Sequence, residues 1–126
     1  MNEQTITRYF LAKPEAALEY PFGPDVAVFK IKNKMFATFA IHNKKEAINL
    51  KCDPNEALAL RDIFDSVIPG YHMNRHHWNT VYLDKSIPKG EIERMIDSSY
   101  ALVVKGLKKS EREHLILQFG KEKLGL

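Results

Sequence analysis

A chain of 126 residues is long enough to bury a hydrophobic core, and its 44% hydrophobic content excludes a disordered protein. Its net charge of +3 at neutral pH is too small to indicate, by itself, a strongly basic nucleic-acid binder. The single cysteine, Cys52, excludes an internal disulfide and fits a reducing compartment. The chain lacks an apolar run of the roughly 18 residues that a membrane helix needs, and it lacks a signal-peptide pattern at its start. We therefore expect a single-domain cytoplasmic protein with no membrane attachment.

Residues 1–24 are expected to form a helical lead-in to the domain. Thr5 is a suitable N-cap for a first helix, and Ile6 and Phe10 recur at helical spacing. Residues 15–20 favour one further helical turn, after which two prolines and a glycine lead the chain into the sheet.

The clearest hairpin is predicted for residues 26–32 and 35–42, which alternate apolar and polar side chains. A two-residue loop at 33–34 would mix lysines into the apolar face. A three-residue loop at 32–34 would keep that face wholly apolar, and burial of one face is what sets strand register. The pairs that this second loop would create are Ile31 with Met35, Phe29 with Ala37, and Ala27 with Phe39.

The next elements are a turn at 43–45, a third strand at 47–52 and a helix. Asp53 is a suitable N-cap for that helix, Pro54 fits its first position, and Glu56 completes a capping box.

A second hairpin is predicted after this helix, with a short strand at 71–73, a turn at 74–77 and a strand at 78–83. The remaining elements are a long helix from Ser86 to about Gly106, a final helix that begins with a capping box at Ser110, and a frayed tail over 120–126.

This order groups the strands in hairpins instead of alternating each strand with a helix. It predicts a two-layer α+β domain over residues 1–126, with an antiparallel five-stranded sheet and helices on one face. A three-stranded meander and the second hairpin would make up the sheet.

Several short motifs follow one another in order over nearly the whole chain. They are Tyr20-Pro-Phe-Gly-Pro-Asp25, Val28-Phe-Lys30, Lys34-Met-Phe-Ala37, Asn49-Leu-Lys-Cys-Asp-Pro54, Pro69-Gly-Tyr-His-Met-Asn-Arg75, His77-Trp-Asn-Thr-Val81 and Leu83-Asp84. Together they resemble the pattern of the MmcQ/YjbR family of small bacterial proteins. Two departures from the family pattern are mild: Lys32-Asn33 stands where the family often has Gly-Gly, and Arg75 stands where Lys is common.

The resemblance implies a two-layer α+β fold similar to that of type III secretion chaperones. Family members are commonly described as predicted DNA-binding proteins, whose hairpins would act as paired wings. The resemblance implies no catalytic residue.

The residues themselves also allow DNA binding, because lysines flank both turns of the meander and a polar segment precedes Trp78. Lys and Arg neutralise phosphates, whereas Asn and aromatic side chains reach bases or sugars. Hairpin lysines also keep sheet edges from aggregating, and a tryptophan is equally suited to a core. The candidate DNA-binding residues are Lys30, Lys32, Lys34, Lys44, Lys45, Asn74, Arg75, His77, Trp78 and Asn79.

A protein or peptide interaction, including a homodimer, is the competing function. Helices on one side of an antiparallel sheet leave a second face that a partner can cover. By strand alternation, the side chains on this second face are Thr38, Ala40, His42, Trp78, Thr80 and Tyr82.

Metal binding and catalysis are disfavoured, and no cofactor is expected. His72, His76 and His77 are close in sequence, but neighbouring residues of a strand point to opposite faces. Cys52 lies on the apolar face of a predicted strand, where a thiol is usually inert. Because phosphate-binding loops and hydrolase motifs are missing as well, the sequence favours a non-enzymatic protein.

Overall fold

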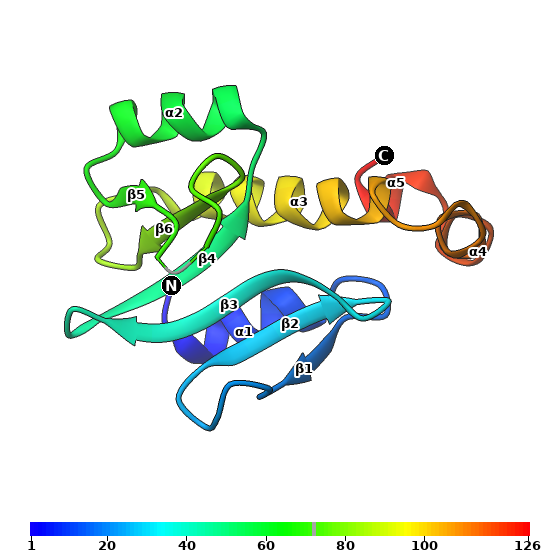
Figure 1. Ribbon diagram of the computed structural model, residues 1–126, viewed down its shortest axis with the longest axis horizontal. Coiled ribbons are helices and arrows are strands. Elements are labelled where there is room, and N and C mark those ends of the chain that lie inside the picture. Colours follow the sequence, from blue (N-terminus) through cyan, green and yellow to red (C-terminus); the bar gives the residue numbers. More distant parts are fainter. Residues whose placement is uncertain (72) are drawn as a thin grey trace.

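The computed structural model describes residues 1–71 and 73–126, which form one antiparallel sheet packed against helices. Six strands follow one another across the sheet in the order β1-β2-β3-β4-β6-β5 (Figure 1). The elements are α1 (Glu3–Leu11), β1 (Ala17–Glu19), β2 (Ala27–Ile31), β3 (Lys34–His42), β4 (Lys45–Lys51), α2 (Pro54–Ile63), β5 (Val67–Pro69), β6 (Trp78–Tyr82), α3 (Lys89–Lys105), α4 (Lys109–Phe119) and α5 (Lys121–Leu124).

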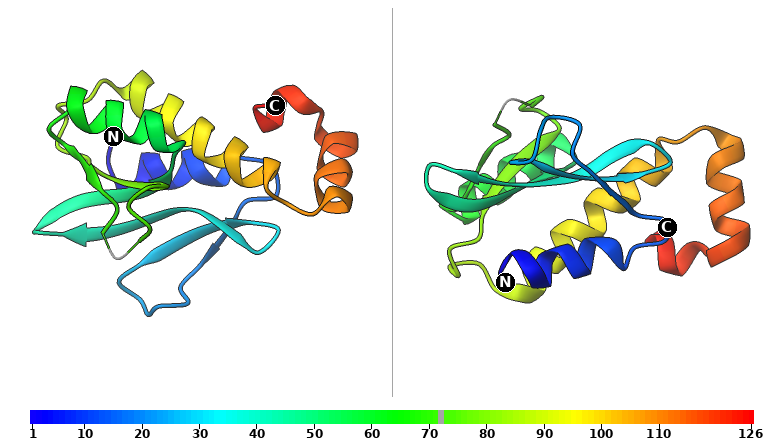
Figure 2. Two further views of the ribbon diagram at one scale, coloured as in Figure 1. Left: turned by 45° about the horizontal axis from the view of Figure 1, so that its top comes forward. Right: turned by 90° about the horizontal axis from the view of Figure 1, so that it is seen from below.

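Helices α1 and α3 cover one face of the sheet, and the opposite face is open. Two connecting segments stand on the open side: the β1–β2 segment, residues 20–26, and the β5–β6 segment, described at residues 70–71 and 73–77 (Figure 2). The structure therefore confirms a two-layer α+β fold with an antiparallel sheet, although the sheet has six strands and not five.

The core lies between the sheet and the helices and is rich in aromatic side chains. The rings of Phe10 and Phe29 have centroids 4.5 Å apart, and those of Phe36 and Tyr100 are 5.2 Å apart in an edge-to-face arrangement. All four side chains are at most 1% exposed. Full burial of one large apolar side chain contributes about 1.5–3 kcal/mol, so these contacts hold α1 and α3 against the strands.

The turn between β2 and β3 differs from the predicted three-residue loop. Ile31 pairs with Lys34, so the loop is the two residues Lys32 and Asn33, with φ angles of 49° and 65°. Two successive positive φ angles are the pattern of a type I′ turn, which matches the twist of the flanking strands. The predicted pair of Ile31 with Met35 is therefore wrong.

A register shift beyond this turn restores the predicted pairing for the rest of the hairpin. Lys30 pairs with Met35, whereas Phe29 pairs with Ala37, so Phe36 is an extra residue in β3. Such a bulge lets two neighbouring residues reach the same side, and Phe36 and Ala37 are both fully buried in the core. The sequence alternation could not indicate this bulge.

The N-terminal segment contains a strand that the sequence analysis missed. The N-cap of α1 is Asn2, not Thr5. The Asn2 side-chain oxygen accepts a 2.9 Å hydrogen bond from the backbone N–H of Thr5, and the Thr5 hydroxyl accepts one of 3.0 Å from the backbone N–H of Asn2. The chain after α1 extends as β1 instead of forming another helical turn. Leu18 lies opposite Phe29 there and packs against the core.

The fourth predicted strand is shifted along the chain. The structure places β5 at Val67–Pro69, directly after α2, because Val67 is a core residue at 2% exposure. Tyr71 and Met73 lie outside any strand, and His72 of the predicted strand lies outside the described residues.

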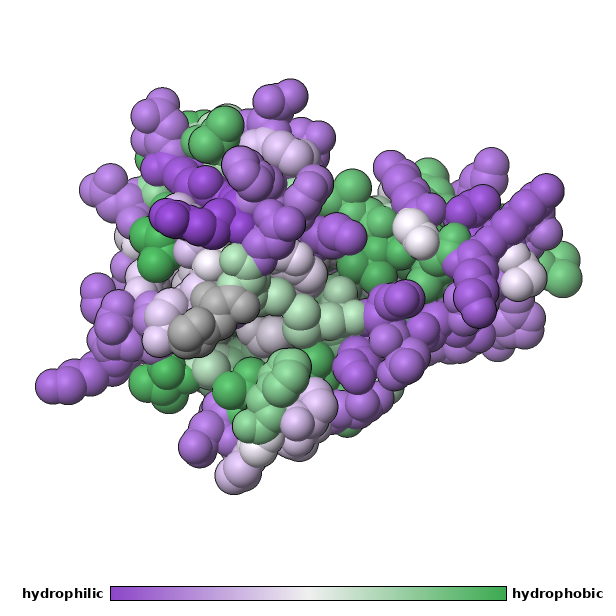
Figure 3. All heavy atoms as spheres, viewed as in Figure 1, coloured by the Kyte–Doolittle hydropathy of each residue, from purple (hydrophilic) through white to green (hydrophobic). Residues whose placement is uncertain are grey.

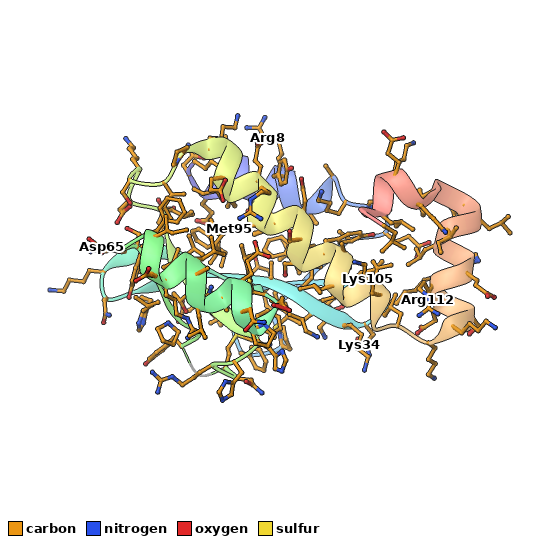
Figure 4. The ribbon with its side chains drawn as sticks, turned by 90° about the horizontal axis from the view of Figure 1, so that it is seen from above. Arg8, Lys34, Asp65, Met95, Lys105 and Arg112 are labelled. Atoms are coloured by element: carbon orange, nitrogen blue, oxygen red, sulfur yellow. The ribbon has the colours of Figure 1, made fainter. Side chains whose placement is uncertain are left out.

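The C-terminal helices begin and end differently from the prediction. Helix α4 follows Lys108 without a side-chain cap, so the predicted capping box at Ser110 is wrong. Arg112 instead ties α4 to the end of α3, because its guanidinium donates to the carbonyl oxygens of Lys105, at 3.1 Å, and Leu107 (Figure 4). Residues 120–126, expected to fray, contain α5, in which Leu124 is buried at 1% exposure.

None of the helices in the described part of the chain is long and apolar enough to cross a membrane.

Candidate functional site

The lysines of the β2–β3 hairpin are partly neutralised. Lys30 forms an ion pair with Glu19 at 3.1 Å, and Lys32 forms one with Glu15 at 3.0 Å. Lys34 is exposed and lies at the same end of the molecule as Lys105, opposite Asp65 (Figure 4). The structure thus leaves Lys34 as the exposed member of this predicted group.

Lys44 and Lys45 are exposed at the opposite end of β3. This strand runs from Lys34 to His42, so the two turns are about 26 Å apart at about 3.3 Å per residue. The Lys45 ammonium lies 5.3 Å from the centroid of the Tyr82 ring. The predicted wings are therefore two separate sites.

Asn79 is a structural residue, not an accessible polar group. It is 2% exposed, and its side chain donates to the Ala57 carbonyl at 3.3 Å and accepts from Arg61 at 2.7 Å. Arg61 also donates to the backbone carbonyls of Arg75 and Trp78. These contacts join α2 to β6 and the segment before it.

One polar side chain of the segment before Trp78, that of Asn74, stabilises the turn within this segment. The Asn74 side chain accepts a 2.9 Å hydrogen bond from the backbone N–H of His76. Arg75, His76 and His77 are exposed, whereas Trp78 is half-buried. No cluster of three potential metal ligands occurs among residues 1–71 and 73–126, and His72 lies outside them.

Cys52 is buried, and its pKa is raised to about 11, first by burial and then by the charge of Glu56. The thiol is therefore protonated at neutral pH and is not an activated nucleophile.

A groove of about 460 Å³ lies on the open face of the sheet. This volume falls within the range of about 300–1,000 Å³ typical of ligand sites. The central strands provide the floor of the groove, and the two connecting segments provide walls. Figure 3 views the open face and shows hydrophobic and weakly polar side chains over the middle of the sheet, with hydrophilic side chains around them. The floor residues are Thr38, Ala40, Ala47, Asn49 and Thr80.

The walls carry apolar and aromatic side chains from segments that are far apart in sequence. Phe22 and Val26 come from the β1–β2 segment, and Tyr71 and Met73 come from the β5–β6 segment. Phe22 is 71% exposed and Tyr71 is 49% exposed. Exposed aromatic side chains beside an apolar groove are typical of an interaction surface.

A chain of hydrogen bonds crosses the floor. The backbone N–H of Tyr71 donates to the Thr80 hydroxyl at 2.9 Å, the Thr80 hydroxyl donates to the Asn49 side-chain oxygen, and the Asn49 amide donates to the Thr38 hydroxyl at 3.0 Å. These bonds join the β5–β6 segment to β6, β4 and β3, so they fix one wall relative to the floor.

Two of the groove residues, His42 and Tyr71, pack in a cluster of three rings with Tyr82. The His42 ring lies 3.9 Å from that of Tyr71 and 5.9 Å from that of Tyr82, and it is nearly parallel to the latter. The Tyr82 hydroxyl accepts a 3.2 Å hydrogen bond from the Asn43 side chain. This stack orients His42 and Tyr71 toward the groove.

The sequence located the floor better than the walls. Strand alternation placed six residues on one face, and Thr38, Ala40, His42 and Thr80 of them line the groove. The other two, Trp78 and Tyr82, are not among its described lining residues. Phe22, in the Pro-Phe-Gly-Pro motif, is a wall residue that the sequence analysis did not single out. The only available signal was an aromatic side chain in an otherwise turn-forming segment.

Comparisons with known proteins agree with this fold. The model of the YjbR family matches residues 11–102. The chain is 38% identical to the uncharacterized protein YbdF of Escherichia coli O157:H7, over 89% of this chain and 92% of the relative. It is 32% identical to the uncharacterized protein YjbR of Escherichia coli K12, over 92% of this chain and 98% of the relative.

Solved structures show the same similarity. The crystal structure of a Deinococcus radiodurans protein with a DUF419 domain superposes with a TM-score of 0.82 at 33% identity, covering 89% of this chain and 86% of that one. A crystal structure of a Pseudomonas syringae protein gives a TM-score of 0.72 at 30% identity, covering 81% and 98%. The chain belongs to the YjbR family.

Proposed function

We propose that the protein is a non-catalytic interaction module that binds an apolar segment of a partner peptide in the groove on the open face. The observation that carries this proposal is the groove itself, about 460 Å³ in volume and lined by apolar and neutral polar side chains together with His42. Apolar surface removed from water is the main favourable term in such an association.

The sheet edges are less suited to a partner than the open face. Both edge strands, β1 and β5, are only three residues long, and β5 ends in Pro69, which has no N–H to donate. A peptide that adds a strand to an edge needs a longer row of free backbone groups. A partner is therefore expected to lie across the face.

A peptide selection with a groove-blocking variant tests this function. Peptides from a displayed random library are selected on the wild-type protein and then measured against Ala40→Arg, whose long side chain would fill the groove. We expect the selected peptides to be apolar and largely uncharged, and to lose at least about tenfold in affinity for the variant, as the loss of a central contact does.

Ala59→Arg is the matched control, because Ala59 is exposed on α2 and is not a groove residue. The same change there should leave the peptide affinity unaltered. Amide NMR spectra should show that both variants are folded. Peptides that bind Ala40→Arg as tightly as the wild type would contradict the proposal.

Duplex DNA is the second candidate ligand, supported by the exposed Lys44 and Lys45 at one turn and by the exposed Arg75. Fluorescence anisotropy of a labelled duplex at about 50 and 200 mM salt tests it, because phosphate contacts make affinity fall steeply over this range. Lys44→Glu with Lys45→Glu should weaken such binding. Lys109→Glu on α4 is the control, and an affinity that the turn variants do not change would exclude a basic-wing mechanism.

A further inference from the structure

The direction of the hydrogen-bond chain on the groove floor is set by the backbone. The N–H of Tyr71 can only donate, so the Thr80 oxygen must accept from it. The proton of the Thr80 hydroxyl is then directed to Asn49, whose side-chain oxygen accepts it. This bond orients the Asn49 amide, so its NH₂ group must face Thr38.

Two hydrogen-bond donors at the end of this series of hydrogen bonds have no acceptor among the described residues. Thr38 accepts from Asn49 at 3.0 Å, and its own O–H has no acceptor among the described residues. Thr38 is only 5% exposed and lines the groove. The Asn49 NH₂ group carries a second N–H that likewise lacks a partner in the described part of the chain. The floor therefore presents O–H and N–H groups side by side.

The surroundings of these donors select against a charged ligand. The groove is lined by neutral side chains and His42, without a lysine, arginine or carboxylate among the described lining residues. A carboxylate that enters such a groove loses hydration and gains no fixed opposite charge. A neutral carbonyl oxygen can accept both donors at a lower desolvation cost.

We propose that Thr38 and Asn49 recognise a carbonyl oxygen of a neutral peptide segment whose aromatic or aliphatic side chain lies against the groove walls. This inference rests on the proposed interaction function and specifies its ligand. The carbonyl accepts from the Thr38 hydroxyl and from the second N–H of Asn49, and the ligand's apolar side chain contacts Phe22 and Met73. The two donors of the groove floor, which lack an acceptor among the described residues, each gain one in this complex.

Two small probes test the inference by titration of the isotope-labelled protein, monitored by amide NMR. N-acetyl-phenylalanine N-methylamide is neutral and carries carbonyl acceptors, whereas N-acetyl-phenylalanine has the same body with a carboxylate. We expect the neutral probe to shift groove resonances and to bind at least about tenfold more tightly than the carboxylate. Thr38→Val, which keeps the side-chain shape without the hydroxyl, should weaken the neutral probe about fivefold, the typical size of one hydrogen bond.

Thr38→Ser keeps the hydroxyl and should restore most of the affinity. Equal binding of the neutral probe to the wild type and to Thr38→Val would overturn the carbonyl inference, while groove binding, and with it the proposed function, would stand. A titration in which neither probe shifts groove resonances would overturn both.

Discussion

Gly70 lies directly after β5, where the backbone approaches β6 too closely for a side chain. A Cβ atom at this position would lie 2.8 Å from the Cβ of Trp78 and 3.0 Å from its carbonyl oxygen. Neither atom can move without the strand, so we expect Gly70→Ala to lower the free energy of unfolding by about 1–3 kcal/mol. Chemical denaturation measures this change.

Gly90, in the first turn of α3, provides the control. A Cβ atom there meets nothing within 4 Å, so Gly90→Ala should be neutral or stabilise the protein by up to about 1 kcal/mol. If both alanine variants unfold at the same denaturant concentration, the close approach at Gly70 is not a structural constraint.

The Asp84 carboxylate accepts hydrogen bonds from Ser66, in the loop before β5, and from Ser86, in the loop before α3. Its protonation makes the stability of the fold depend on pH. Its pKa is lowered to about 2, first by the hydrogen bond from Ser66 and then by that from Ser86. A carboxyl group whose pKa is lower in the folded state stabilises the fold at pH values above its unfolded-state pKa. That stability is lost as the pH falls from about 3.8 to about 2. Asp84 is exposed, so the contribution should be about 1 kcal/mol or less.

Ser66→Ala removes the larger cause of this shift, so the pKa of Asp84 should rise toward its ordinary value. A carbon-detected NMR titration of the carboxyl group measures it directly. The stability difference between the wild type and Asp84→Asn should shrink below pH 3.8. A difference that stays constant to about pH 2 would show that the hydrogen bonds from the two serines do not favour the charged form.

At the scale of elements, α5 is a structural part of the domain. Leu124 is 1% exposed and belongs to the core, whereas Leu117 on α4 is 89% exposed. We expect Leu124→Ala to cost about 2–4 kcal/mol in unfolding free energy and Leu117→Ala to cost less than about 0.5 kcal/mol. Thermal or denaturant unfolding of the two variants measures the contrast, and equal stabilities would mean that the tail does not pack.

Sequence patterns predicted the helices and strands that are determined by residues close together in the sequence. Asp53 caps α2 as predicted, because its carboxylate accepts from the N–H groups of Asn55 and Glu56. The Glu56 carboxylate, expected to complete a capping box, pairs with Arg94 at 2.7 Å instead. The outer register of the β2–β3 hairpin also follows from its alternation. The elements β1 and β5 escaped prediction, because three-residue strands carry too few side chains to show a period and depend on pairing with distant strands.

In the candidate site, too, the part determined by local sequence was predicted and the part determined by tertiary contacts was not. Alternation along β3 and β6 is a local property, and it placed Thr38, Ala40 and Thr80 on one face. The walls depend on how the β1–β2 and β5–β6 segments fold back over the sheet, which depends on tertiary contacts. Among the residues predicted to contact DNA, Asn79 is a buried anchor. Alternation along β6 puts it on the face opposite Thr80, but spacing does not reveal its hydrogen bonds to α2.

At the scale of the whole molecule, one ligand should affect two segments that are about fifty residues apart along the chain. The β1–β2 segment and the β5–β6 segment contribute walls to the same groove. A ligand that contacts both walls stabilises both segments, so saturation with the neutral probe should slow amide hydrogen exchange in the two segments together. Amides of α4 serve as the internal reference, and protection of only one segment would contradict a shared groove.

The separation of floor from walls has an evolutionary consequence. The floor belongs to β3, β4 and β6, whose opposite side forms the core, so most substitutions that alter these strands also affect folding. The walls belong to connecting segments, where substitutions generally cost less stability. A change of ligand preference in the proposed groove is therefore expected to cost less stability when it arises in a wall than when it arises in the floor.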